Sequence, residues 1–371
     1  MTIQSLELIN FRNYERQKIS FSDGINILYG QNAQGKTNIL EALYIASTGK
    51  SHRTNSYHDL IKNGYQGFEL KLDAVVNDRD NNITIRYSKE NGRYAEINGV
   101  KRDKLSDILG TLNIILFSPE TLEVVKGSPA IRRKFLDIIL CQTNRQYLHI
   151  LKRYNQLIKN KAIALKMGKH EKKYEEMIPV WNEHISMYGA KITFIRKNAI
   201  SELDFFMKNG IHTITDGTEN SELQYRTFCN FDKDSDEEYF KNQLINTLSR
   251  GIKKELSISQ CLYGPHRDDF EILLNGMNSR QYCSQGQQRT LALSLILSEL
   301  LFVEGIKGEK PVLLLDDVMS ELDLKRQEYL IKSLSNVQTI ITTTDELPYA
   351  NIKEREVKKF FIKSGKVMNE S

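Results

Sequence analysis

Cysteine and long apolar runs are both scarce in this chain. Its four cysteines lie far apart with no CxxC pair, which excludes a disulfide scaffold and a structural zinc site and is typical of a thiol-reducing cytosol. The longest near-continuous apolar stretch, 291–303, is interrupted by Ser294, Ser298 and Glu299 and is too short to cross a bilayer. The N-terminus lacks the basic segment and apolar block of a signal peptide. We therefore expect a cytoplasmic protein that does not act on a membrane.

Positive charge is concentrated in one part of the sequence. The 371 residues are 40% hydrophobic and 27% charged with a formal net charge of +5, a composition and length that predict a globular protein of two domains. Residues 131–170 alone contain ten Lys or Arg against one acid, Asp137, so the rest of the chain is slightly acidic. Such a block favours a polyanionic partner such as nucleic acid, although a solvated helix face explains the same charge.

The sequence pattern changes along the chain from strand to helix and back. Short alternating or apolar segments predict strands in the first hundred residues, and Asn91-Gly92 predicts a hairpin turn. From Ser128-Pro129, an N-cap and first-turn pair, to a stop at Gly168, apolar residues recur at helical spacing. We predict an α/β lobe built from 1–130 and 257–371, with a mainly helical lobe inserted at 131–256.

Residues 30–37 match the phosphate-binding pattern GxxxxGK[ST] between an apolar strand and a helix. Backbone N–H groups of such a loop surround the phosphates, and the helix N-terminus adds partial positive charge. Lys36 is expected to reach the β- and γ-phosphates, and Thr37 to give its hydroxyl to Mg²⁺. The sequence therefore predicts that the chain binds a nucleoside triphosphate. The residues expected to bind it are Gly30, Gln31, Asn32, Ala33, Gln34, Gly35, Lys36, Thr37 and Asn38.

A second segment, PVLLLDD at 311–317, predicts a buried strand that ends in two carboxylates. Alone this pattern is ordinary, but with a phosphate-binding loop in the same chain it predicts a magnesium site. Asp316 is the expected metal ligand. Asp317 is expected to orient or deprotonate the attacking water, so the predicted catalytic residues are Lys36, Asp316 and Asp317.

A third segment, SQGQQR at 284–289, opens a strong helix. Ser284 and Gln287 have the spacing of a capping box, and Gly286 lets an anion approach the backbone. Ser284, Gly286 and Gln287 are therefore expected to bind the γ-phosphate held by another subunit; an ordinary N-cap is the alternative.

The order of these motifs, followed by SELD at 320–323, resembles the Walker A, signature, Walker B and D-loop series of the ATP-binding-cassette (ABC) ATPases. The loop sequence GxNxxGKTN, preceded by LINFRNY at 8–14, resembles the SMC-like heads rather than the transporter heads. Further stretches across most of the chain resemble the RecF family of that class. They are TGKSHR at 48–53, FSPE at 117–120, KGSP at 126–129 with RRxFLD at 132–137, and YGPHRDD at 263–269.

This resemblance implies an α/β fold, an ABC/SMC-type P-loop ATPase head with a mixed sheet and an inserted helical lobe. It implies an ATP-induced homodimer that binds double-stranded DNA, single-strand/double-strand junctions and gaps during replication and recombinational repair. Partners implied are RecR and RecO, with RecA loaded downstream. Each head would supply Lys36, Thr37 and Asp316 to its own ATP and Mg²⁺ site and its signature residues to its partner's.

Two departures from the family pattern predict slow hydrolysis, and the resemblance implies that DNA stimulates it. Asp317 stands where related heads carry the longer Glu, and threonines at 342–344 follow the last apolar strand, where many cassettes have a histidine. Thr343 and Thr344 are both candidates to replace it.

The remaining candidates come with alternatives. Arg12 and Asn13 are expected to contact a nucleotide phosphate or base, or else to form a surface turn. Arg53 is expected to face DNA, or else to cap the preceding helix. Within the basic block, the predicted DNA contacts are Arg132, Arg133, Lys152 and Arg153. Alternative functions are an ABC-type ATPase subunit coupled to another protein partner, and a structural clamp with negligible turnover.

Overall fold

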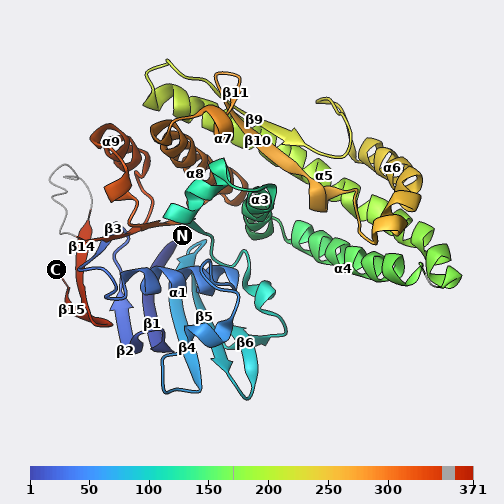
Figure 1. Ribbon diagram of the computed structural model, residues 1–371. Coiled ribbons are helices and arrows are strands. Elements are labelled where there is room, and N and C mark those ends of the chain that lie inside the picture. Colours follow the sequence, from blue (N-terminus) through green and yellow to red (C-terminus); the bar gives the residue numbers. More distant parts are fainter. Residues whose placement is uncertain (170, 345–355, 371) are drawn as a thin grey trace. The chain divides into compact units, whose positions relative to one another are not determined.

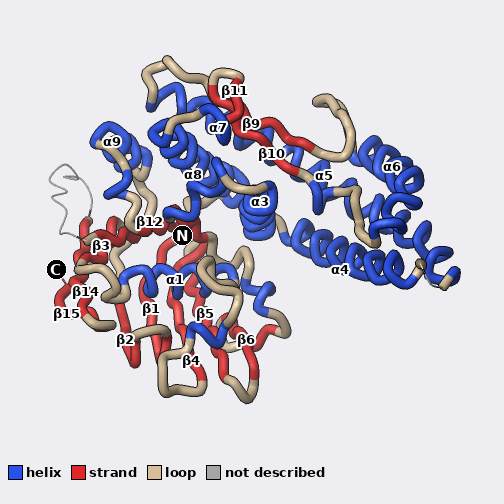
Figure 2. Tube along the Cα trace, in the orientation of Figure 1, coloured by secondary structure: helices blue, strands red, loops and turns tan. Residues whose placement is uncertain are grey.

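The computed structural model describes residues 1–169, 171–344 and 356–370, and the chain divides into two compact units (Figures 1 and 2). Unit 1 comprises Met1–Glu123, Thr213–Asp216 and Arg289–Ser371. Unit 2 comprises Val124–His212 and Gly217–Gln288.

Unit 1 contains an antiparallel sheet of the order β2-β1-β4-β5-β6-β7. Apolar side chains alternate along its strands, so that one face is buried, as along β4. The hairpin expected at Asn91-Gly92 is confirmed, since β5 and β6 pair antiparallel on either side of it. The strands are β1 (Thr2–Phe11), β2 (Tyr14–Ser20), β4 (Gly67–Val76), β5 (Arg79–Ser88), β6 (Gly92–Ile97) and β7 (Val100–Arg102).

A second sheet in unit 1 has the order β15-β14-β3-β13-β12-β8 and is parallel except for the β14–β15 pair. Its central strands β12 and β13 are buried along their whole length, as expected when both faces of a parallel sheet are covered. The predicted mixed sheet is confirmed. The strands are β3 (Ile25–Tyr29), β8 (Ile114–Phe117), β12 (Val312–Asp316), β13 (Thr339–Thr343), β14 (Val357–Lys363) and β15 (Lys366–Glu370).

Helix α1 (Lys36–Thr48) packs against strands of both sheets (Figure 1). Eleven of its thirteen residues are buried, so the helix is covered on nearly all sides rather than along one stripe. It begins at Gly35 and ends at Gly49, both in the left-handed region. The helices α8 (Gln285–Lys307, from Arg289 onward) and α9 (Leu324–Ser333) complete unit 1.

Unit 2 is mainly helical, as predicted (Figure 2). It contains α3 (Pro129–Thr143), α4 (Arg145–Met167), α6 (Glu237–Ile258), the short α7 (Ser279–Tyr282) and most of α5 (Lys172–Ile214). The start at Ser128-Pro129 and the stop at Gly168 are confirmed. The sequence pattern missed a break at Asn144, whose side chain accepts from the backbone N of Tyr147 and starts a new helix.

A three-stranded sheet within unit 2 was not predicted. Its strands β9 (Ser221–Arg226), β10 (Asp269–Leu274) and β11 (Met277–Asn278) have the order β11-β10-β9. Strand β10 pairs along its whole length with β9, and residues 257–288 therefore belong to unit 2. The sequence pattern, by contrast, places these residues in the α/β lobe. In the described ranges, no helix is long and apolar enough to cross a membrane.

Candidate ATPase active site

The loop between β3 and α1 has the geometry of a phosphate-binding loop. Gly30 and Gly35 have φ of 144° and 118°, and Ala33 between them has φ of 63°, so the backbone curls in conformations that regular elements exclude. Lys36 Nζ donates to the carbonyl oxygens of Gly30 at 2.5 Å and Gln31 at 2.9 Å. The loop thus holds its lysine over its own backbone.

The charges of the two carboxylates at the end of β12 act on Lys36. Burial lowers the pKa of Lys36, while the charges of Asp317 and Asp316 act in the opposite direction. The predicted catalytic residues Lys36, Asp316 and Asp317 are therefore brought together, although they come from segments nearly 280 residues apart.

Asp316 lies at the end of β12 with 7% of its surface exposed. Thr37 Oγ1 donates to Asp316 Oδ1 at 2.9 Å, and Thr342 Oγ1 donates to the same oxygen at 2.7 Å. Thr342 is placed there by register, since β12 and β13 pair in parallel with Asp316 opposite Thr342. A carboxylate and a threonine hydroxyl within hydrogen-bond distance are the oxygen ligands suited to a small hard divalent cation.

Asp317 has a left-handed backbone with φ of 54°, a conformation that costs a non-glycine residue energy and is concentrated at functional sites. Its backbone N donates to Thr342 Oγ1 at 2.9 Å, and Ser320 Oγ donates to its carbonyl oxygen at 2.8 Å. Thr342 thus contacts both aspartates. Among the threonines at 342–344, it is the one bonded to Asp316 and Asp317, whereas the sequence analysis favoured Thr343 or Thr344.

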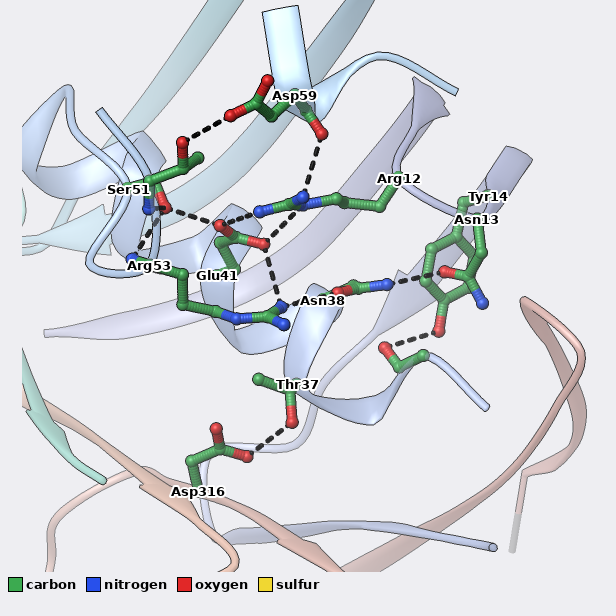
Figure 3. Close-up of polar contacts among 12 residues, drawn as sticks. Arg12, Asn13, Tyr14, Thr37, Asn38, Glu41, Ser51, Arg53, Asp59 and Asp316 are labelled. Carbon is green, nitrogen blue, oxygen red and sulfur yellow. Dashed lines mark hydrogen bonds and ion pairs between the residues drawn. The ribbon is translucent and has the colours of Figure 1, made fainter. Parts of the chain in front are cut away.

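Glu41 of α1 is a fully buried carboxylate that holds two arginines (Figure 3). Arg12 donates to both of its oxygens at 2.8 and 2.9 Å, Ser51 Oγ donates at 2.5 Å, and Arg53 Nη1 lies 3.3 Å away. Burial on its own raises the pKa of Glu41, but the hydrogen bonds from Arg12 and Ser51 and the two guanidinium charges outweigh it and lower the pKa. Glu41 is therefore a carboxylate in the folded protein.

Arg53 also reaches the start of helix α1, since its Nη1 donates to Asn38 Oδ1 at 3.0 Å (Figure 3). Asn38 Nδ2 in turn donates to Asn13 Oδ1 at 2.9 Å, and Asn13 Nδ2 donates to the carbonyl oxygen of Gln34 at 2.9 Å. The predicted nucleotide residues Arg12 and Asn13 and the predicted DNA residue Arg53 thus form one hydrogen-bonded cluster around the start of α1.

Sequence reasoning missed Glu41. A signal was available, because Glu41 is the only charged residue between Thr37 and Thr48, within the mainly apolar run 39–46. A lone carboxylate in such a helix is buried at a cost unless cations neutralise it.

The signature segment lies in unit 2. The predicted capping box is confirmed, since Gln287 N donates to Ser284 Oγ at 3.2 Å and Ser284 N donates to Gln287 Oε1 at 2.9 Å. Gln287 Nε2 also donates to Glu219 Oε1 at 2.7 Å. The side chain of Gln287 is therefore used for the cap and for this bond, while Ser284 is exposed and Gly286 lies in the first turn of α8.

The basic block divides into paired and exposed side chains. Arg132 is 6% exposed and donates from two nitrogens to the carboxylate of Asp269 at 2.7 and 2.8 Å, so it is a buried structural residue. This burial argues against the predicted DNA contact of Arg132. Lys161, in the same block, is fully buried beside Glu255 at 2.6 Å.

The other predicted DNA residues of the block retain surface. Arg153 is exposed, Lys152 is half-buried, and Arg133 is half-buried with one bond to the carbonyl oxygen of Asp268 at 2.6 Å. Part of the positive charge that the sequence count assigns to a surface is therefore neutralised in the interior.

Comparison with known proteins gives matches over almost the whole chain. The family model described as RecF/RecN/SMC N terminal domain matches residues 2–367. The "DNA replication and repair protein RecF" of Clostridium kluyveri is 41% identical over 99% of both chains, and that of Clostridium botulinum is 40% identical over 99% of both.

Solved structures agree. The structure titled "recombination mediator protein RecF-ATPrS in RecFOR pathway" has a TM-score of 0.91 at 36% identity and covers 99% of this chain and 97% of that one. The corresponding RecF-ATP structure has a TM-score of 0.92 at 35% identity, over 100% and 97%. An SMC head bound to the C-terminal winged-helix domain of ScpA has a TM-score of 0.58 at 16% identity, over 100% and 97%, and shows the fold alone.

The mixed sheet, the phosphate-binding loop and the paired aspartates at the end of β12, together with the family model and the RecF structures, define an SMC-like ABC ATPase head. Within that class, identity of about 40% to RecF proteins over almost the whole chain shows which family this is. The chain belongs to the RecF family.

Proposed function

We propose that this protein is an ATP-dependent DNA-binding clamp of replication and recombinational repair. Two copies close on ATP, bind double-stranded DNA, single-strand/double-strand junctions and gaps, and reopen after slow hydrolysis. Support comes from the family, whose curated members are named DNA replication and repair proteins, and from relatives solved with ATP. A cytoplasmic location goes with such a substrate.

The ATPase chemistry follows from the cluster at the end of β12. Lys36 would neutralise the β- and γ-phosphates, and Thr37 and Asp316 are oxygen ligands that fit Mg²⁺, which supplies charge neutralisation of the phosphoryl oxygens when bound. Asp317 would orient or deprotonate the attacking water. Because aspartate is one methylene shorter than the glutamate of related heads, we expect slow turnover.

The dimer would complete each site. In this proposal Ser284 and the backbone at Gly286 meet the γ-phosphate bound by the partner copy, because the helix N-terminus there offers N–H donors and partial positive charge. Gln287 acts by holding the cap, given its bonds to Ser284 and Glu219. Closing one interface assembles both sites, so ATP binding to the two copies is cooperative.

The contact that links ATP to DNA in this proposal is the one between Arg53 and Asn38. Arg53 retains 39% of its side-chain surface, and Asn38 directly follows the magnesium ligand Thr37 in the sequence. A change at the start of α1 therefore moves Asn38, the side chain to which Arg53 is bonded.

Further DNA contacts are proposed for Arg133, Lys152 and Arg153 of unit 2. RecR and RecO are the proposed protein partners, with RecA loaded downstream, supported by relatives described in the RecFOR pathway.

The test is fluorescence anisotropy of labelled duplex, single-stranded and gapped DNA, each without nucleotide, with Mg·ATP and with Mg·ADP. We expect DNA binding that appears with Mg·ATP and fades with Mg·ADP. In Lys36→Ala, ATP should not increase DNA binding. Equal affinity in all three nucleotide states would remove the switch from the mechanism, and no binding in any state would exclude DNA as a direct ligand. Phosphate release measured with and without DNA distinguishes a slow ATPase from a structural clamp that does not turn over.

A further inference from the structure

The C-terminal hairpin β14–β15 contacts the phosphate-binding loop. Strand β14 pairs in parallel with β3, the strand that leads into the loop, with Phe361 opposite Tyr29. The two strands approach so closely at Gly30 that a Cβ added there would lie 2.4 Å from the carbonyl oxygen of Ile362. The first glycine of the loop is therefore packed against the backbone of β14.

The turn of this hairpin bonds the middle of the same loop. Ser364 N donates to Gln34 Oε1 at 2.7 Å, and Gly365 N donates to the carbonyl oxygen of Gln34 at 3.0 Å. Asn13 Nδ2 donates to that same carbonyl at 2.9 Å. The peptide of Gln34 is thus held from two sides by segments remote in sequence.

Gly365 also meets Asn13 directly. Its φ is +71°, and a Cβ at this position would lie 2.6 Å from the carbonyl oxygen of Asn13 and 3.1 Å from Asn13 Nδ2. Asn13 Oδ1 accepts from Asn38, the residue after Thr37. A side chain at position 365 must therefore either displace Asn13 from the start of α1 or displace the Ser364-Gly365 turn from the phosphate-binding loop.

We propose that the turn Ser364-Gly365 is a positioning element of the nucleotide site, which sets ATP affinity by fixing Gln34 and Asn13. The proposal rests on the ATP binding proposed above. The left-handed residues Ala33 and Gly35 prevent the loop from forming the regular backbone hydrogen bonds of a helix or strand. Its conformation therefore depends on hydrogen bonds from other segments. A loop that samples its binding-competent shape for only a fraction of the time binds more weakly in proportion to that fraction.

The test compares Gly365→Ala with Gly276→Ala. Gly276 is also in a hairpin turn, with φ of +77° and a left-handed residue before it, but a Cβ there meets nothing within 4 Å. Both substitutions place a Cβ on a left-handed backbone of nearly the same φ, so both incur the same conformational strain. The difference between the two variants therefore isolates the contact with Asn13.

We expect Gly365→Ala to raise the Kd of Mg·ATP and the KM of hydrolysis by about tenfold, with kcat changed by less than about twofold. The kcat is spared because the backbone N–H groups of the turn bond Gln34, whereas Thr37 bonds Asp316. Gly276→Ala should match the wild type in all three quantities. Equal Kd values in the two variants, or a fall in kcat at unchanged KM, would overturn the proposal.

Gln34→Ala is the second variant, in case Gly365→Ala does not fold. It removes the side-chain oxygen that accepts from Ser364 N at 2.7 Å and from Ser364 Oγ at 3.5 Å, without adding an atom. We expect the Kd of Mg·ATP to rise by roughly two- to fivefold, which corresponds to the loss of one hydrogen bond of normal length. An unchanged Kd here rejects the role of the turn. A wild-type protein that binds no ATP would instead reject the proposed function, so the two failures are distinguishable.

Discussion

The cluster around Glu41 allows a quantitative prediction of what one carboxylate contributes. Glu41→Gln keeps the size of the side chain and removes its charge, leaving Arg12 and Arg53 without their shared anion. Breaking a buried ion pair by removing one partner costs about 3–5 kcal/mol. Because the arginine side chains are 20% and 39% exposed and can turn partly to water, we expect Glu41→Gln to cost less than a fully buried pair, about 2–3 kcal/mol.

The pH dependence has a defined sign. The folded-state pKa of Glu41 is lowered, so its contribution is present above the unfolded-state pKa of about 4.3 and is lost as the pH falls through the folded value. The stability difference between wild type and Glu41→Gln should therefore be largest near neutral pH and should shrink in acid.

Thermal unfolding at pH 7 and across the acid range measures both effects. For a unit of this size, the loss lowers Tm by roughly 4–12 °C. Glu7→Gln is the control, since Glu7 pairs with Arg16 and Lys71 at the surface and should change stability by less than about 1 kcal/mol. The cluster does not act as a buried ion pair if Glu41→Gln and Glu7→Gln have the same Tm. The same conclusion follows if the stability difference between wild type and Glu41→Gln does not shrink in acid.

Two further predictions concern catalysis and DNA. Thr342→Val removes the hydroxyl that bonds both Asp316 and Asp317, and should lower kcat for phosphate release by about 10- to 100-fold with ATP still bound; a kcat within twofold of wild type would refute this role. Arg153→Ala should weaken DNA binding and reduce the slope of log affinity against log salt by about one, whereas Arg132→Ala should lower Tm and leave that slope unchanged. An equal change of slope in both variants would contradict the division of the basic block into buried and exposed side chains.

Local patterns predicted the elements that carry the chemistry. The phosphate-binding loop, the strand ending at Asp316 and the capping box of Ser284 and Gln287 each depend on residues close together in sequence, so spacing alone indicates the geometry. The recurrence of apolar residues at helical spacing predicted the helical lobe, and the family resemblance implied the mixed sheet.

What the sequence did not reveal depends on strand pairing and burial. Thr342 contacts Asp316 because β13 pairs with β12 in one register, and Ser364 reaches Gln34 across 330 residues of chain. Residue counts also do not distinguish Arg132, which is paired in the interior, from Arg153, which is exposed. The role of Glu41 is defined by two arginines from different segments, a combination that no local pattern contains.

The coupling between ATP and DNA is tested most directly by reciprocal affinities in Asp317→Asn, a variant expected to bind ATP without consuming it during the titration. If ATP tightens the binding of gapped DNA by some factor, linkage requires DNA to tighten the binding of ATP by the same factor. The account predicts equal factors of at least about fivefold in the two titrations. A Kd for ATP that is the same with and without saturating DNA would contradict it.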